Sequence, residues 1–266
     1  MQQALSTVGN ELGDMHYYNL QFRRYKWVVD TVERYLKPGS AIADIGSAPG
    51  HLSMTLSDLG YKVTAFDFDP GSDMWESTPD GSFAKSLQKR GVPLKHWDVE
   101  VGDPADVPTG EVHGQFDCVI FTEILEHVYR YPFATVRQVA HLLKPGGICI
   151  VTTPNRGSLP FRLKFLAGMP CDTPLNLLHD YFPPHMRHVW LYTPKEVQTV
   201  LHEANLETVE SNVQCFHLWT TTISTREILP YWRPTNIKQM LKPALALIYS
   251  VLPELGDTVC CVARKV

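Results

Sequence analysis

The chain has 266 residues, of which 44% are apolar and 20% charged, as in an ordinary globular enzyme and unlike a disordered or fibrous protein. Its net charge of −4 excludes a global positive field that would recruit nucleic acid or acidic lipid. The polar N-terminal stretch is not expected to act as a signal peptide. None of the six cysteines forms a CxxC pair, and no apolar run approaches the roughly 20 residues of a bilayer span. We therefore expect a cytoplasmic protein with reduced thiols and no transmembrane segment.

Helix and strand patterns alternate along the first 153 residues. An amphipathic helix is predicted over 17–36, and residues 1–40 are expected to form an N-terminal helical cap. The following elements are predicted in chain order: a strand at 41–46, a helix at 52–59, a strand at 61–69, a weak helix at 83–90, strands at 93–99 and 116–122, a helix at 132–143 and a strand at 148–153. This alternation predicts a doubly wound, Rossmann-like α/β fold with a parallel sheet between helical layers.

The pattern loosens after Thr153. Residues 154–190 are rich in proline and aromatic side chains and too long for an ordinary connection, so a lid or subdomain is expected there. Thr193, Pro194 and Glu196 then form the signature of a capping box, which predicts a helix running to Ala204. Strands are predicted at 206–213 and 256–266, and residues 217–255 between them form a second insertion with a helix near 237–252.

The first predicted strand ends in DIGSAPG, from Asp44 to Gly50, directly before a helix. Glycines at such a junction let the backbone approach a ligand, and Asp67, at the end of the next strand, can accept hydrogen bonds from ribose hydroxyls. The loop lacks the GxGxxG spacing of dinucleotide folds, and an acid pointing into it suits an ammonium group better than a pyrophosphate. S-adenosylmethionine (SAM) is therefore favoured over a dinucleotide and over a tight turn that binds nothing.

Several stretches together resemble the class I SAM-dependent methyltransferases: ADIGSAPG, VTAFDFDP, WDVE, FDCVIFTEILEHV and LKPGGICIVTTPN. The chain is similar to methyltransferases of types 11 and 12 and to ubiquinone-pathway O-methyltransferases. The resemblance covers roughly residues 15–205 and the last strand. It implies one methyltransferase domain over residues 1–266, a seven-stranded sheet with an antiparallel last strand, and lids inserted after strands five and six.

The resemblance also assigns cofactor contacts. The side chains and loop residues that it places around SAM are Asp44, Gly46, Ser47, Ala48, Gly50, Asp67, Phe68, Asp98, Val99, Thr122 and Glu123. Asp67 would bind the ribose, and Asp98 with Val99 would meet the adenine, with Asp103 as a rival for that contact. Ala48 stands where the family usually has glycine, and its methyl group is small enough to be tolerated.

The stretch FTEILEHV places Glu123, Glu126 and His127 at i, i+3 and i+4, on one face if the segment is helical. Three interpretations remain open. His127 can act as a general base with Glu126 as its partner; or Glu123, Glu126, His127 and the downstream His188 can hold a divalent metal (Mg²⁺, Mn²⁺ or Zn²⁺), as in similar metal-dependent O-methyltransferases; or the group is only structural.

The methyl acceptor is expected beneath the inserted segments, where histidines cluster at His179, His185 and His188 and aromatic side chains are frequent: Phe161, Phe165, Tyr181, Phe182, Trp190, Tyr192, Phe216, Trp219, Tyr231 and Trp232. They favour an apolar pocket for an aromatic or lipid-like small molecule, methylated on a hydroxyl oxygen. Arg156, Arg162 and Lys164 either meet an acidic substrate or are solvated. A metal-dependent RNA 2′-O-methyltransferase is the rival enzyme, although no basic stripe favours nucleic acid, and a non-catalytic SAM-binding regulator or partner subunit is the rival of another class. The apolar run KPALALIYSVL can pack on the domain, form a homodimer face or contact a membrane surface.

Overall fold

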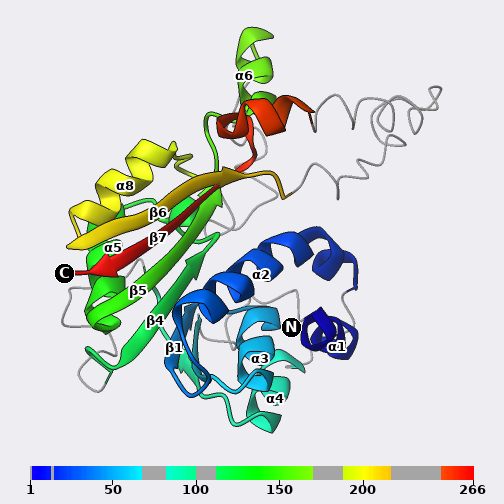
Figure 1. The fold of residues 1–266 in the computed structure, drawn as a ribbon, viewed down its shortest axis with the longest axis vertical. Coiled ribbons are helices and arrows are strands. Elements are labelled where there is room, and N and C mark those ends of the chain that lie inside the picture. Colours follow the sequence, from blue (N-terminus) through cyan, green and yellow to red (C-terminus); the bar gives the residue numbers. More distant parts are fainter. Residues whose placement is uncertain (1, 13–14, 68–81, 100–111, 170–187, 217–246) are drawn as a thin grey trace.

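The computed structural model describes residues 2–12, 15–67, 82–99, 112–169, 188–216 and 247–266. Seven strands form one sheet in the order β3-β2-β1-β4-β5-β7-β6 (Figure 1). Their bounds are Ala41–Ile45 (β1), Lys62–Asp67 (β2), Leu94–His96 (β3), Phe116–Thr122 (β4), Leu143–Pro154 (β5), Leu206–Gln214 (β6) and Thr258–Lys265 (β7). Strands β1 to β5 pair in parallel, whereas β7 is antiparallel to both β5 and β6. The predicted mostly parallel seven-stranded sheet with an antiparallel last strand is confirmed.

Helices cover both faces of this sheet (Figure 1). One face carries α1 (Gln2–Leu12), α2 (Met15–Tyr35), α3 (His51–Asp58) and α4 (Ser82–Lys89), and the other carries α5 (Pro132–Leu142) and α8 (Pro194–His202). Successive residues of a strand point to opposite faces of the sheet. In β4, Cys118 and Ile120 therefore pack in the core beneath α1 to α4, whereas Val119 and Phe121 pack in the core beneath α5 and α8. Because both faces are covered, β4 reads as a continuous apolar run.

The observed elements differ from the predicted ones mainly at their ends. Strand β3 keeps only Leu94–His96 of the predicted 93–99, and β5 begins at Leu143, five residues before the predicted start of its strand at 148. The capping box of α8 is confirmed, because the Thr193 N–H donates to Glu196 Oε2 at 2.7 Å and the Glu196 N–H donates to Thr193 Oγ1 at 3.4 Å. Of the helix predicted near 237–252, residues 247–251 are helical, and 237–246 lie outside the described residues.

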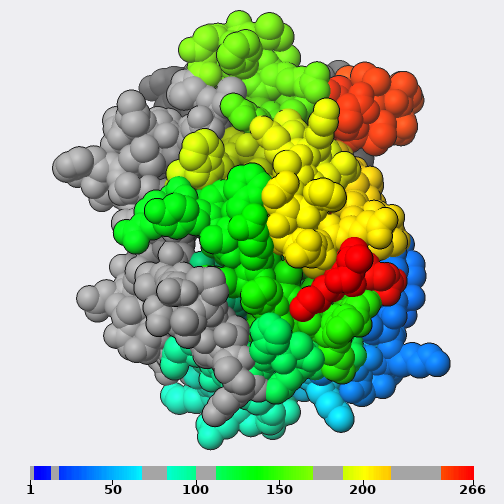
Figure 2. Space-filling model, turned by 90° about the vertical axis from the view of Figure 1, so that its left-hand side faces the viewer, coloured from blue at the N-terminus to red at the C-terminus, as the bar shows by residue number. Residues whose placement is uncertain are grey.

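Helix α6 (Leu159–Leu166) begins shortly after the end of β5, within the first predicted insertion. In both overall views it lies near the helical residues 247–251 at one end of the molecule (Figures 1 and 2), and Figure 1 shows that this end lies beyond the carboxyl end of β5. None of its residues is buried. Within the described part of the chain, no helix combines the length and apolar character that crossing a bilayer would need.

Candidate active site

The loop between β1 and α3 is built around two glycines in left-handed conformations, Gly46 with φ 67° and Gly50 with φ 98°. A Cβ on Gly46 would overlap the side chain of Ile124, and one on Gly50 would come within 2.8 Å of the Phe83 ring. These glycines are therefore required by the packing of the chain itself. Their absence of side chains lets the loop touch the segment that follows β4, which brings two predicted parts of the site together.

Two carboxylates, those of Asp44 and Asp67, lie next to this loop. Asp44 is 2% exposed, and its Oδ2 accepts a hydrogen bond of 2.6 Å from Ser53 Oγ. Burial raises the pKa of Asp44 to about 7, and the charge of Asp67 acts in the same direction. Asp67, at the end of β2, accepts a hydrogen bond of 2.8 Å at Oδ2 from the Ala48 N–H. The neighbouring ends of β1 and β2 thus place two acids at one edge of the sheet.

A pocket of about 100 Å³ opens at this edge. Its lining includes six residues predicted to contact a cofactor: Asp44, Gly46, Ser47, Ala48, Thr122 and Glu123. Ser47 Oγ is buried and has no hydrogen-bond partner among the described residues, which leaves a hydroxyl for a ligand.

Helix α2 contributes a residue that the sequence interpretation missed. Arg24 lines the pocket although it is only 4% exposed, and its Nε donates to Gln21 Oε1 at 2.9 Å. Its charge lowers the pKa of Asp44, against the larger effect of burial. The sequence signal was weak because Arg23 and Arg24 are adjacent, and only the packing of α2 shows which of the two turns inward.

The segment after β4 is not the α-helix whose shared face was considered. Glu123 has a left-handed φ of 56°, and only Leu125–His127 form a short 3₁₀ helix. The Glu123 N–H donates to Thr152 O at 2.8 Å, and Glu123 Oε1 accepts from Thr152 Oγ1 at 2.8 Å. Glu123 lines the smaller pocket, while Glu126 is buried beside His127.

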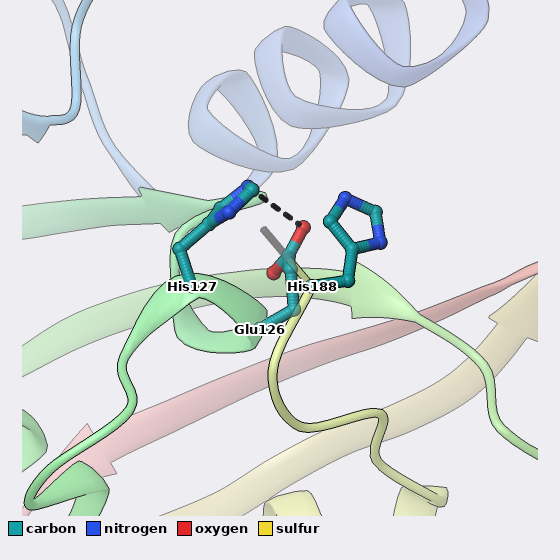
Figure 3. Close-up of side chains that lie close together, drawn as sticks. All are labelled: Glu126, His127 and His188. Carbon is teal, nitrogen blue, oxygen red and sulfur yellow. Dashed lines mark ion pairs between the residues drawn. The ribbon is translucent and has the colours of Figure 1, made fainter. Parts of the chain in front are cut away.

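Glu126, His127 and His188 converge, with the Glu126 carboxyl between the two imidazoles (Figure 3). His127 Nε2 lies 3.9 Å from Glu126 Oε1. The centroids of the His127 and His188 rings are 4.9 Å apart, and the ring planes meet at 80°. One donor atom from each of the three residues lies within 4.8 Å of the others. Of the four predicted metal ligands these three come together, whereas Glu123 is not part of the cluster.

The buried carboxyl of Glu126 has one satisfied oxygen. Oε2 accepts from Thr153 Oγ1 at 2.9 Å, but Oε1 has no hydrogen bond within the described ranges. Burial, followed by the charge of Glu123, raises the pKa of Glu126 well above its usual range. Burial lowers the pKa of His188, so both groups favour their neutral forms. Such a set suits proton exchange, and it would hold a cation only with the Glu126 carboxyl ionised.

Backbone contacts hold the cluster in place. The N–H groups of Val189 and Trp190 donate to Glu126 O at 2.8 and 3.3 Å, which fixes His188 against the 3₁₀ helix. The asparagine of the TTPN stretch, Asn155, is completely buried. Its Nδ2 donates to the carbonyls of Glu254 and Gly256 at 2.9 and 2.8 Å, and this ties the end of β5 to the start of β7.

A second cavity, of about 490 Å³, adjoins this cluster. The residues that line it come from α2, the segments after β4 and β5, α6 and the start of β7: Gln21, Arg24, Glu123, Glu126, His127, Pro154, Ser158, Pro160, Phe161, Lys164, His188, Asp257 and Thr258. Arg24 and Glu123 line both this cavity and the smaller pocket. The two spaces therefore meet across one cation and one carboxylate.

The remaining predicted site residues lie elsewhere. Gly50, Asp67, Asp98 and Val99 line neither space, and Val99 O accepts a hydrogen bond from Thr135. Phe68 and Asp103 lie outside the described residues, as do His179, His185, Tyr181, Phe182, Trp219, Tyr231 and Trp232. Among the described aromatics expected around the acceptor, Phe161 lines the cavity, Phe165 and Trp190 are exposed, and Tyr192 and Phe216 are buried away from the cavity wall.

Comparison with known proteins gives a consistent result. A family model described as "Methyltransferase domain" matches residues 18–211. The ubiquinone biosynthesis O-methyltransferase of Xanthomonas campestris pv. campestris is 32% identical over 180 residues, which cover 64% of this chain and 70% of that enzyme. The protein of the same name from Ruegeria pomeroyi is 28% identical over 194 residues, covering 71% of this chain and 70% of the relative.

Solved structures share the fold at low sequence identity. The magnesium protoporphyrin IX methyltransferase of Synechocystis, crystallised with bound S-adenosylhomocysteine, superposes with a TM-score of 0.55 at 14% identity and covers 95% of this chain and 86% of its own. A SAM-dependent methyltransferase from Methanosarcina mazei gives 0.54 at 16% identity, covering 89% and 97%. These similarities concern the fold alone.

Proposed function

The chain belongs to the class I SAM-dependent methyltransferases, and from this premise we propose that it methylates a hydroxyl oxygen of a small molecule held in the larger cavity. The observation that carries the proposal is the meeting of the two spaces across Arg24 and Glu123, with His127 in the wall of the larger one. A volume of about 490 Å³ lies within the usual range for small-molecule sites. The relatives named as O-methyltransferases favour oxygen as the acceptor atom.

The residues around the smaller pocket fit SAM. When bound, SAM supplies a methyl group on a sulfonium, so the protein has to align the partners and expose an oxygen lone pair. We assign the ammonium group to Asp44, the carboxylate to Arg24 and a hydrogen bond to Ser47 Oγ, because the buried charges and the unpartnered hydroxyl complement those groups. Asp67 is assigned to the ribose, and Asp98 with Val99 to the adenine.

His127 is proposed to take the proton of the acceptor hydroxyl. Its ring lines the larger cavity, and imidazole is the side chain best suited to proton transfer near neutral pH. The Glu126 carboxyl, 3.9 Å from Nε2, orients the ring and is itself held by Thr153. Glu126 is therefore proposed as a positioning residue.

The test is a turnover assay with SAM and a set of benzenediols, comparing the wild type with His127→Gln. Loss of a positioned base is expected to lower kcat by about 10²- to 10⁴-fold with little change in SAM affinity. His202→Gln replaces an exposed histidine of α8 and serves as the matched control. Wild-type turnover by His127→Gln would refute the role of His127, and no transfer to any hydroxyl by the wild type would refute the proposed function.

A metal-assisted version of the same reaction is the second candidate. The convergence of Glu126, His127 and His188, together with the unpartnered Glu126 Oε1, favours it. These residues would hold a divalent cation, which would acidify the acceptor hydroxyl by its charge. Loss of turnover in a chelator with recovery on adding Mg²⁺, Mn²⁺ or Zn²⁺ supports this version, and unchanged turnover excludes it.

A further inference from the structure

Lys164 is a cation of the larger cavity that the reaction as described does not use. It lies on α6, and its Nζ is 5.3 Å from the centroid of the Phe161 ring, so the ammonium group and the ring line the same part of the cavity. Within the described ranges, no carboxylate lies within ion-pair distance of Lys164. A cation at the wall of a ligand cavity without an acidic partner is available to a ligand.

Two other cations of this segment are engaged by the protein itself. The Arg162 Nε donates to Gly157 O at 2.7 Å, and Arg156 Nη1 lies 3.7 Å from Glu196 Oε1. Neither arginine lines the cavity. The geometry therefore singles out Lys164 from three basic residues that the sequence alone could not tell apart.

Each acid of the cavity accepts at least one hydrogen bond from the chain. Glu123 accepts from Thr152 Oγ1 and Glu126 from Thr153 Oγ1. Asp257 accepts from the Phe216 N–H at 3.0 Å and from Thr258 Oγ1 at 2.8 Å. These contacts bind the carboxylates to the cavity wall, and among the described residues none of the three forms an ion pair with Lys164.

We propose that Lys164 determines acceptor specificity by binding an acidic group, a carboxylate or a phosphate, on the same molecule whose hydroxyl reaches His127. The proposal rests on the proposed function, since it names the class of acceptor for that site. In this arrangement Phe161 contacts the ring of the acceptor, and Lys164 forms an ion pair with the acidic group of the acceptor. This ion pair places the acceptor hydroxyl next to the smaller pocket, where SAM is proposed to bind. An acceptor with both ends bound loses fewer orientations on reaction than one held by its ring alone.

Three acceptors of matched shape test this inference in steady-state assays with SAM: a neutral benzenediol, the same ring with a carboxylate, and the same ring with a phosphate. Removing the charge in Lys164→Gln is expected to lower kcat/KM for an acidic acceptor by about tenfold, with the neutral ring little affected. Lys164→Arg should restore most of the loss. Arg162→Gln makes the same charge change on the same helix, outside the cavity, and should behave as the wild type.

A binding measurement separates this inference from the proposed function. The methylated forms of all three rings are titrated into the protein with S-adenosylhomocysteine present, so that no turnover is needed. Binding that weakens about tenfold in Lys164→Gln, but not in Arg162→Gln, supports the assignment even if no methyl transfer is found. The inference is overturned if the wild type binds neither acid better than the neutral ring, or if Lys164→Gln and Arg162→Gln change all three ligands equally.

Discussion

Replacing Asp44 by asparagine should stabilise the unliganded protein and weaken SAM binding at the same time. Asp44 is almost completely buried, and its pKa is raised from 3.8 to about 7, chiefly by burial. The charged carboxylate is therefore costly in the folded chain. Asparagine keeps an oxygen that can accept the hydrogen bond from Ser53 Oγ but carries no charge.

The sign of this stability difference follows from the linkage between folding and proton binding at Asp44. Between pH 3.8 and about 7 the folded wild type holds a proton on Asp44 that the unfolded chain has lost, so its free energy of unfolding falls as the pH rises through this window. At about 1.4 kcal/mol per pH unit, the full shift corresponds to at most about 4 kcal/mol. Burying the added amide of asparagine offsets about 1–3 kcal/mol. We expect Asp44→Asn to be more stable than the wild type by about 1–3 kcal/mol at pH 8.

The measurement is urea unfolding of both proteins without ligand at pH 5, 6, 7 and 8. Because the other titrating groups are shared, the difference between the two curves isolates Asp44, and it should grow with pH and level off above about pH 7. Calorimetric titration with SAM should show wild-type affinity rising over the same range, as the carboxylate ionises, and Asp44→Asn binding at least about tenfold more weakly at pH 8. This account of Asp44 would be refuted if the free energies of unfolding of the two proteins changed in parallel with pH, or if both proteins bound SAM equally tightly at pH 8.

Three further substitutions test the architecture by urea unfolding. Gly46→Ala forces a left-handed alanine against Ile124 and should cost about 3 kcal/mol; relief by a second Ile124→Ala change is expected, and a neutral single variant would contradict the packing described. Thr193→Ala removes the capping box and should cost about 1 kcal/mol without altering SAM affinity, so a SAM effect would argue against a purely local role. Asn155→Ala leaves two carbonyls without their donor and should cost about 2–4 kcal/mol; a loss below about 0.5 kcal/mol would show that the link between β5 and β7 is dispensable.

Much of the fold could be predicted because its signals are local. A strand that is covered on both faces is mostly apolar, as β4 is apart from Asp117 and Thr122, and a capping box needs only the four residues from Thr193 to Glu196. The positions of Asp44 and Asp67 at strand ends were predictable for the same reason, since parallel strands present their carboxyl ends at one edge. The segment after β4 was harder, because a left-handed glutamate leaves no clear mark in the sequence.

By itself, then, the sequence determined which segments become strands and helices and which acids stand at the edge of the sheet, because periodicity, caps and strand ends depend on near neighbours. Only the tertiary structure decided which side chains meet in the site. Arg24 comes from α2, His188 from a segment 61 residues beyond His127, and Lys164 from α6. Their approach depends on how α2 packs on the sheet and on how the segments after β4 and β5 contact each other. Such long-range packing is set by the whole core, which no short stretch of sequence encodes.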